Sequence, residues 1–161
     1  MTTIRDYPET AHGQAFQGDV LIARLPVRYA DHLDKSEPVP PVAGRLILQE
    51  GEVTGHHHAI RLPGMPQVAM FRDDALTRDL AASAPVSIGT AVMHRDRALS
   101  DRLVRDGILT RSDLVVGFLT VEGGPMTVTH EEHDGIRLPP GLYLIGRQIE
   151  SAGAEERMVQ D

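Results

Sequence analysis

Many apolar residues of this chain fall in short runs that alternate with polar positions and are bounded by glycine or proline. Such runs span residues 18–26, 45–60, 67–71, 86–93, 114–129 and 141–149. A period of two is typical of β-strands, because successive side chains of a strand point to opposite faces. The pattern therefore predicts a mainly β domain, arranged as a small sandwich or a barrel-like fold.

A different pattern interrupts the strands between about residues 65 and 110. Residues 73–82 and 95–106 each carry leucines four positions apart, as on one face of a helix. Asp73 is suited to cap the first helix, and Gly107 is placed to end the second. We expect a partly helical insertion that the β core does not need and that contacts another subunit or a partner protein.

The whole chain, residues 1–161, is expected to form one domain. It is long enough to bury one core and short for two. Residues 1–16 are polar and lack periodicity, which predicts an N-terminal arm that becomes ordered only against a neighbouring subunit. Residues 151–161 are acidic and predict a frayed tail.

Composition and charge narrow the class of partner. Hydrophobic residues make up 41% and charged residues 24% of the chain, as in globular proteins. The net charge is −7 and the arginines are scattered, so no direct contact with nucleic acid is expected. The longest apolar run, residues 114–119, is too short to span a membrane. The first residues lack the apolar stretch of a signal peptide, so we expect synthesis in the cytoplasm.

The candidate chemistry lies in two histidine-rich segments, residues 56–58 and 130–133. Imidazole suits divalent transition metals such as Zn, and Glu52, Glu131 or Glu132 could add an oxygen ligand. Because the chain has no cysteine, thiolate ligands and disulfides are excluded. The candidate metal ligands are His56, His58, His130 and His133.

The alternative interpretation of the same residues is a structural network of neutral histidines, hydrogen-bonded to carboxylates and backbone groups. In either case the two segments are expected to meet in space, since clustered polar groups satisfy one another's hydrogen bonds. Strand alternation then places His56 and His58 inward and His57 on the opposite side. No cofactor other than a metal is indicated.

Two known metal motifs are close to these segments without matching them. The first cupin motif has a glutamate a few residues after His-x-His, whereas residues 59–63 here are Ala-Ile-Arg-Leu-Pro. The zincin motif has histidines four apart on a helix, whereas His130 and His133 are three apart. The sequence shows no nucleophile motif and no pocket, so no catalytic residue is assigned and an enzymatic function is not expected.

As a set, the motifs resemble those of a group of small, mostly uncharacterised proteins. Their common pattern is a Gly-Asp-Val-Leu-type first strand, then Gly-His-His-His, His-Glu-Glu-His and Leu-Pro-Pro-Gly before an aromatic strand. Here these motifs are residues 18–21, 55–58, 130–133 and 138–141. Many such proteins appear in phage genomes and in phage-derived gene transfer particles, near head genes. The resemblance, which covers about residues 17–63 and 114–150, implies a component of a particle.

We therefore expect a structural component of a phage-like particle, such as a head-surface, spike-base or decoration protein, that acts by oligomeric assembly. The expected partners are further copies of the chain and other particle proteins, from the capsid or a fibre. The expected location is the virion or particle. The alternative is a small cytosolic metalloenzyme that uses the four candidate histidines as ligands.

Overall fold

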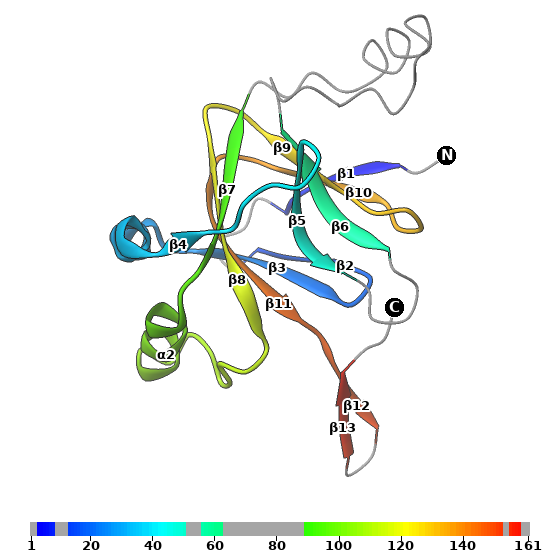
Figure 1. Ribbon diagram of the computed structural model, residues 1–161. Coiled ribbons are helices and arrows are strands. Elements are labelled where there is room, and N and C mark those ends of the chain that lie inside the picture. Colours follow the sequence, from blue (N-terminus) through cyan, green and yellow to red (C-terminus); the bar gives the residue numbers. More distant parts are fainter. Residues whose placement is uncertain (1–2, 9–12, 51–55, 63–88, 153–154, 159–161) are drawn as a thin grey trace, which may run out of the picture.

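The computed structural model describes residues 3–8, 13–50, 56–62, 89–152 and 155–158. This part of the chain is mainly β and folds as a β sandwich-like domain, so the predicted fold class is confirmed. A five-stranded and a six-stranded sheet form its two main β layers (Figure 1). The strand predicted at residues 67–71 and the helix predicted at residues 73–82 lie outside the described residues.

The five-stranded sheet contains both histidine-rich segments. Its order is β1 (Ile4–Asp6), β10 (Gly135–Leu138), β9 (Met126–Thr129), β6 (His57–Arg61) and β5 (Arg45–Glu50). Strands β5 and β6 form the hairpin that the alternating pattern predicts. Strand β6 also pairs with β9, with Ala59 opposite Thr129 and Ile60 opposite Val128. Since His58 directly precedes Ala59 and His130 directly follows Thr129, this pairing places the two segments side by side.

The six-stranded sheet is antiparallel throughout. Its order is β2 (Gln14–Gln17), β3 (Val20–Leu25), β11 (Gly141–Arg147), β8 (Val115–Glu122), β7 (Thr90–Arg95) and β4 (Glu37–Pro38). Residues 142–146 of β11 are all buried, because other layers cover both faces of this strand. A strand covered on both faces is expected to lose the apolar–polar alternation, as β11 does.

The main core lies between the two sheets. One sheet contributes inward-facing side chains such as Leu46, Ile60, Val128 and Ile136, and the other contributes Val20, Ile22, Leu119 and Ile145. Each of these side chains is at most 1% exposed. Burial of an aliphatic side chain of this size stabilises the fold by roughly 1.5–3 kcal/mol.

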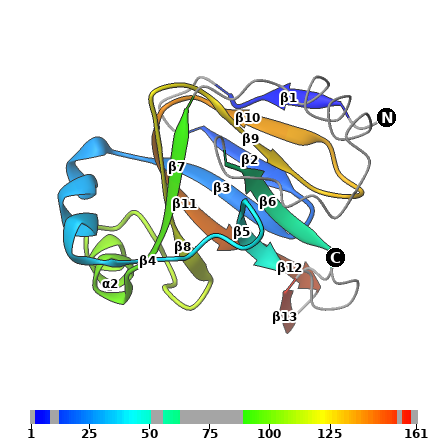
Figure 2. The same cartoon turned by 45° about the horizontal axis from the view of Figure 1, so that its top comes forward.

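A second core lies on the other side of the six-stranded sheet. There, η1 (Val27–Lys35) and α2 (Arg97–Arg105) lie beside the sheet (Figure 2). Their buried side chains pack with Phe118 of β8 and with Leu142 and Leu144 of β11. The helix α2 begins at Asp96, whose carboxylate accepts a hydrogen bond from the Leu99 N–H at 2.9 Å. It ends before Gly107, whose φ of +76° suits glycine at a helix end. Neither described helix is long and apolar enough to cross a membrane.

The prediction that residues 65–110 form one insertion dispensable to the core is wrong for its second half. Strand β7 lies inside the six-stranded sheet, between β8 and β4. Leu99 and Leu103 of α2 are completely buried, against Tyr29 and Phe118 among others. The helical period was correctly identified, but the pattern does not reveal which apolar surface a helix covers. Residues 65–88 of the predicted insertion lie outside the described residues.

The prediction that residues 1–16 need a neighbour to become ordered is contradicted where this segment is described. Strand β1 pairs in parallel with β10 of its own chain, and β2 pairs with β3. Tyr7 is only 3% exposed and enters the main core. A single large aromatic side chain therefore anchors a segment that otherwise lacks apolar periodicity.

The prediction of a frayed tail from residue 151 is also wrong in part. Strands β12 (Ile149–Ala152) and β13 (Glu155–Met158) pair with each other as an antiparallel hairpin. The hairpin extends away from the two main sheets (Figure 1). The acidic composition of this segment suggested a solvated coil, but a solvated hairpin can have the same composition.

Ionisation of the buried tyrosines is expected to make the fold sensitive to high pH. The Tyr7 and Tyr143 rings meet edge to face, with centroids 5.3 Å apart. Burial raises the pKa of Tyr143 to about 12 and also raises the pKa of Tyr7. An unfolded tyrosine ionises near pH 10. The unfolded state therefore releases this proton first, and stability should decline from about pH 10 to pH 12.

Absorbance at 295 nm, recorded together with circular dichroism across this range, tests the expectation. Full ionisation of all three tyrosines at pH 10 in a still folded protein would contradict it.

Candidate functional site

A tight turn between β2 and β3 places two polar side chains at one end of the sandwich. Gln17 pairs with Val20, so only Gly18 and Asp19 connect the strands. Gly18 has a φ of +56°, a conformation that glycine adopts without the strain of a side chain. Gln17 and Asp19 are nevertheless only 1% and 5% exposed. Buried polar groups of this kind require partners, and they find them on the opposite sheet.

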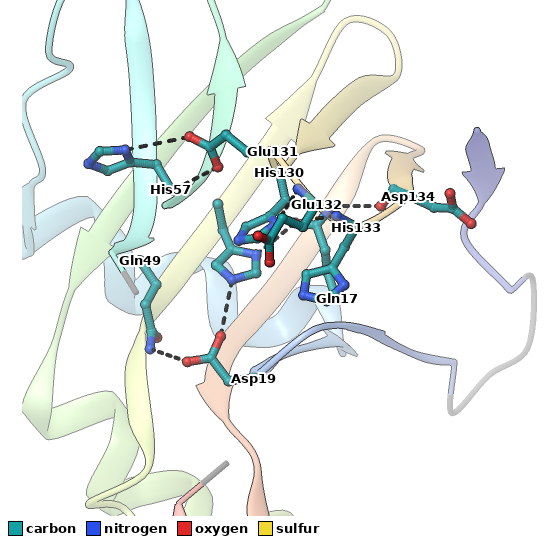
Figure 3. Close-up of polar contacts among 10 residues, drawn as sticks. Gln17, Asp19, Gln49, His57, His130, Glu131, Glu132, His133 and Asp134 are labelled. Carbon is teal, nitrogen blue, oxygen red and sulfur yellow. Dashed lines mark hydrogen bonds and ion pairs between the residues drawn. The ribbon is translucent and has the colours of Figure 1, made fainter. Parts of the chain in front are cut away.

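The partner of both side chains is His58, which is completely buried on β6. Its Nδ1 lies 2.8 Å from Gln17 Oε1, and its Nε2 lies 3.1 Å from Asp19 Oδ1 (Figure 3). The Gln17 amide donates to the carbonyl oxygens of Val128 and Asp134, so its Oε1 is the atom left to accept from His58. Both ring nitrogens of His58 therefore donate, and the ring is protonated beside the Asp19 carboxylate.

Gln49 of β5 completes the environment of this carboxylate. Its side-chain nitrogen donates to Asp19 Oδ2 at 3.3 Å, and Gln49 is 6% exposed. Each oxygen of Asp19 thus accepts a hydrogen bond from the five-stranded sheet. We call the contacts among Gln17, Asp19, Gln49 and His58 the polar clasp, because they join the two sheets at one end of the main core.

His130 has a different role in the turn that follows β9. Its Nδ1 accepts hydrogen bonds from the backbone N–H groups of Glu132 at 3.1 Å and His133 at 3.3 Å. This is the bonding that an aspartate or asparagine provides in an Asx-turn. Since Nδ1 accepts, the proton of the neutral ring lies on Nε2.

The structure brings together all four histidines proposed from the sequence. The His130 ring lies between those of His58 and His133, with centroids 4.3 and 4.6 Å away and planes tilted by about 30°. The His56 ring meets His130 edge to face at 5.5 Å. The prediction that the two segments meet in space is therefore confirmed.

His58 is buried and its neighbour His57 only partly so, as strand alternation predicts for two faces of β6. In Figure 3 the His57 ring points away from His130 and His133. The His57 backbone N–H donates to Glu131 Oε2 at 3.0 Å, and its ring lies near Glu131 and Glu50. Burial alone would raise the pKa of Glu131. Hydrogen bonds from the backbone N–H groups of His57 and Glu131, together with the nearby histidines, outweigh this and hold that pKa below its usual range.

A set of potential metal ligands exists where the start of β6 meets the turn after β9. Atoms of His56, His130 and Glu131 that can bind a metal lie within 4.8 Å of one another. His58 cannot join them while both of its nitrogens donate to Gln17 and Asp19. His130 would need an unprotonated Nε2 to bind through that atom, whereas its turn hydrogen bonds place the proton there. The hydrogen bonds therefore favour the network interpretation over a metal centre.

Three members of the polar clasp were not identified from the sequence: Gln17, Asp19 and Gln49. Asp19 stands at the start of a strongly apolar strand, and Gln49 follows Leu46–Leu48 inside another. A single polar residue within an apolar run is the signal that could have found them. Which polar residues face each other depends on the pairing of strands far apart in the sequence.

The pocket lined by residues 95–97, 112–113 and 115–118 among others lies between the start of α2 and β8, and has a volume of about 420 Å³. None of the residues that line it belongs to the clasp or to the histidine-rich segments. The histidines therefore do not line this pocket.

His130→Ala is expected to lower the free energy of unfolding by about 1–3 kcal/mol, because two backbone N–H groups of the turn lose their acceptor. His57→Ala is the matched control. The His57 side chain makes only ion-pair contacts with the exposed carboxylates of Glu50 and Glu131, which contribute about 0–1 kcal/mol. Urea unfolding of both variants measures the difference, and equal losses would contradict the assigned role of His130.

Comparison with known proteins gives one match. The model of a family described as "Domain of unknown function (DUF8820)" matches residues 16–98. The matched range begins just before the turn at Gly18 and includes Asp19, Gln49 and His58, but not His130 or His133. No curated protein and no solved structure matches the chain.

Proposed function

Because the chain belongs to the DUF8820 family, whose description names no activity, we propose its function from its geometry and its sequence motifs. The protein is a structural component of a phage-like particle and works by oligomeric assembly. Its partners are further copies of the chain and other particle proteins, from the capsid or a fibre.

The observation that carries the assembly proposal is the hairpin β12–β13. Within the described part of the chain, its two strands pair only with each other, as a separate two-stranded sheet. Two-stranded hairpins are at best marginally stable in water and need a surface to pack against. The hairpin extends away from its own sandwich (Figure 1), so a surface on another molecule suits it better than its own core.

The histidine-rich segments support a structural role for the domain. His58 and His130 are buried, and both ring nitrogens of His58 and the Nδ1 of His130 hold together groups of the chain itself. A catalytic histidine needs a ring nitrogen that reaches a substrate. The placement on a particle rests on the sequence resemblance to proteins found near phage head genes.

The molar mass of the full chain, measured by sedimentation over a range of concentrations, tests the assembly proposal. We expect an oligomer for the full chain and a folded monomer for a chain that ends at Gln148. Glu156→Pro, which disrupts β13 without shortening the chain, should also give a monomer. A full-length chain that stays monomeric at all concentrations would contradict assembly of copies. Detection of the protein by mass spectrometry in purified phage-like particles tests the proposed location on the particle.

The second candidate is a small His-ligated metalloenzyme, which the proximity of His56, His130 and Glu131 favours. A chelator separates the two candidates. Treatment of the purified protein with the chelator is expected to leave its melting temperature unchanged, because internal hydrogen bonds hold His58 through both ring nitrogens and His130 through Nδ1. A stoichiometric metal whose removal lowers the melting temperature would support the metalloenzyme instead.

A further inference from the structure

We propose that a row of arginines on the outer face of the five-stranded sheet binds the acidic β12–β13 hairpin of a second copy of this chain. We call Arg45, Arg61 and Arg137 the arginine row. The inference rests on the proposed function and deepens it, because it identifies the two surfaces that meet when copies assemble.

The register of the sheet places the arginine row on one face. Arg45 is directly opposite Arg61 in the β5–β6 pair, and the next pair, Leu46 and Ile60, is buried in the main core. Since strand side chains alternate, both arginines face away from that core. Arg137 of β10 also lies on the outer face, because its neighbours Ile136 and Leu138 are buried.

The row extends across most of the sheet. The sheet order β10-β9-β6-β5 leaves only β9 between the strand of Arg137 and the strand of Arg61. Neighbouring strands lie about 5 Å apart, so Arg45 and Arg61 are about 5 Å apart at the backbone and Arg137 is roughly 10 Å farther along. Three arginines that are far apart in the sequence thus form a cationic row in the folded chain.

The chain itself does not neutralise this charge well. Like charges directly opposite each other on paired strands are destabilising. In the described ranges, the guanidinium groups of Arg45 and Arg61 have neither a hydrogen bond nor an ion pair. Arg137 contacts Asp6 at 3.6 Å, but both side chains are largely exposed, at 48% and 82%. Such a surface pair is weak, and another carboxylate can replace it.

The hairpin has the complementary charge. Its strands contain Glu150, Glu155 and Glu156 and a single cation, Arg157. Because the whole chain has a net charge of −7, an acidic segment of a second copy is repelled by most of the surface. The arginine row is an exception, and opposite charges there would both attract the hairpin and fix its position.

Charge reversal in the full-length chain tests the contact. Arg61→Glu should weaken self-association at least about tenfold, measured by sedimentation at low salt, because it converts attraction of the hairpin into repulsion. The double variant Glu155→Arg/Glu156→Arg should weaken it similarly. Combining the three changes should recover much of the association. The matched control is Arg105→Glu, which changes the same charge at an exposed position of α2, in the layer beyond the other sheet.

The outcomes separate this contact from assembly itself. A wild-type oligomer that Arg61→Glu leaves intact would overturn the contact, while assembly through another surface would stand. A wild-type chain that is always monomeric would overturn both. Binding of wild-type protein to a DNA duplex that Arg61→Glu abolishes, with the oligomer unchanged, would also overturn the contact, because it would show the row to be a phosphate-binding surface.

Discussion

Asp19→Ala is expected to lower the free energy of unfolding by about 3–5 kcal/mol, measured by urea unfolding. The substitution removes the carboxylate that faces the protonated ring of buried His58 at 3.1 Å and also accepts from Gln49. The charge on His58 then has no counter-ion in a part of the core that is closed to water. Either His58 releases its proton when the protein folds, or this end of the sandwich opens to let water reach the charged ring.

The matched control is Asp113→Ala, which removes an ion pair with Arg111 that is about half exposed. We expect a loss of about 0–1 kcal/mol there. The double variant Asp19→Ala/His58→Ala should lose less than the sum of the two single variants, because the second change removes the uncompensated charge. Additive losses, or a loss below about 1 kcal/mol for Asp19→Ala, would show that the two residues do not form a buried ion pair.

Leu103→Ala is expected to lower the free energy of unfolding by about 2–5 kcal/mol. Leu103 is completely buried in the second core, between α2 and the six-stranded sheet. Truncation leaves a cavity that surrounding side chains such as Tyr29 and Phe118 fill only partly. The same measurement on Val27→Ala is the control, since Val27 is 74% exposed and its loss should be within about 0.5 kcal/mol. A tolerated Leu103→Ala would restore the interpretation of α2 as dispensable.

Local signals predicted the strands well and the packing less well. The alternation at residues 45–60 predicted the strands that form the β5–β6 hairpin, and Gly107 marked the end of α2. These features depend on neighbours in the chain. The helix α2 packs on the apolar outer face of β8 and β11. A strand that is buried on both faces is apolar at most positions, so its sequence does not show which element covers each face.

The sequence predicted only one half of the candidate site, the half that the histidine-rich segments form. Dense imidazole and carboxylate groups in two short segments indicated that His58 and His130 would meet, because isolated polar groups are costly in a core. The other half, Gln17 and Asp19, comes from the opposite sheet. They reach His58 only because the two sheets pack with the β2–β3 turn beside β6. No local sequence pattern shows which segments of the two sheets will face each other.

The protonation states of His58 and His130 test the structural account of the cluster most directly. A long-range ¹H–¹⁵N spectrum of uniformly labelled protein distinguishes the protonated ring and both neutral tautomers of each histidine. We expect that His58 carries protons on both nitrogens, and that His130 is neutral with its proton on Nε2. A His130 ring with its proton on Nδ1, together with a neutral His58, would contradict the network and leave a metal centre as the better explanation of the cluster.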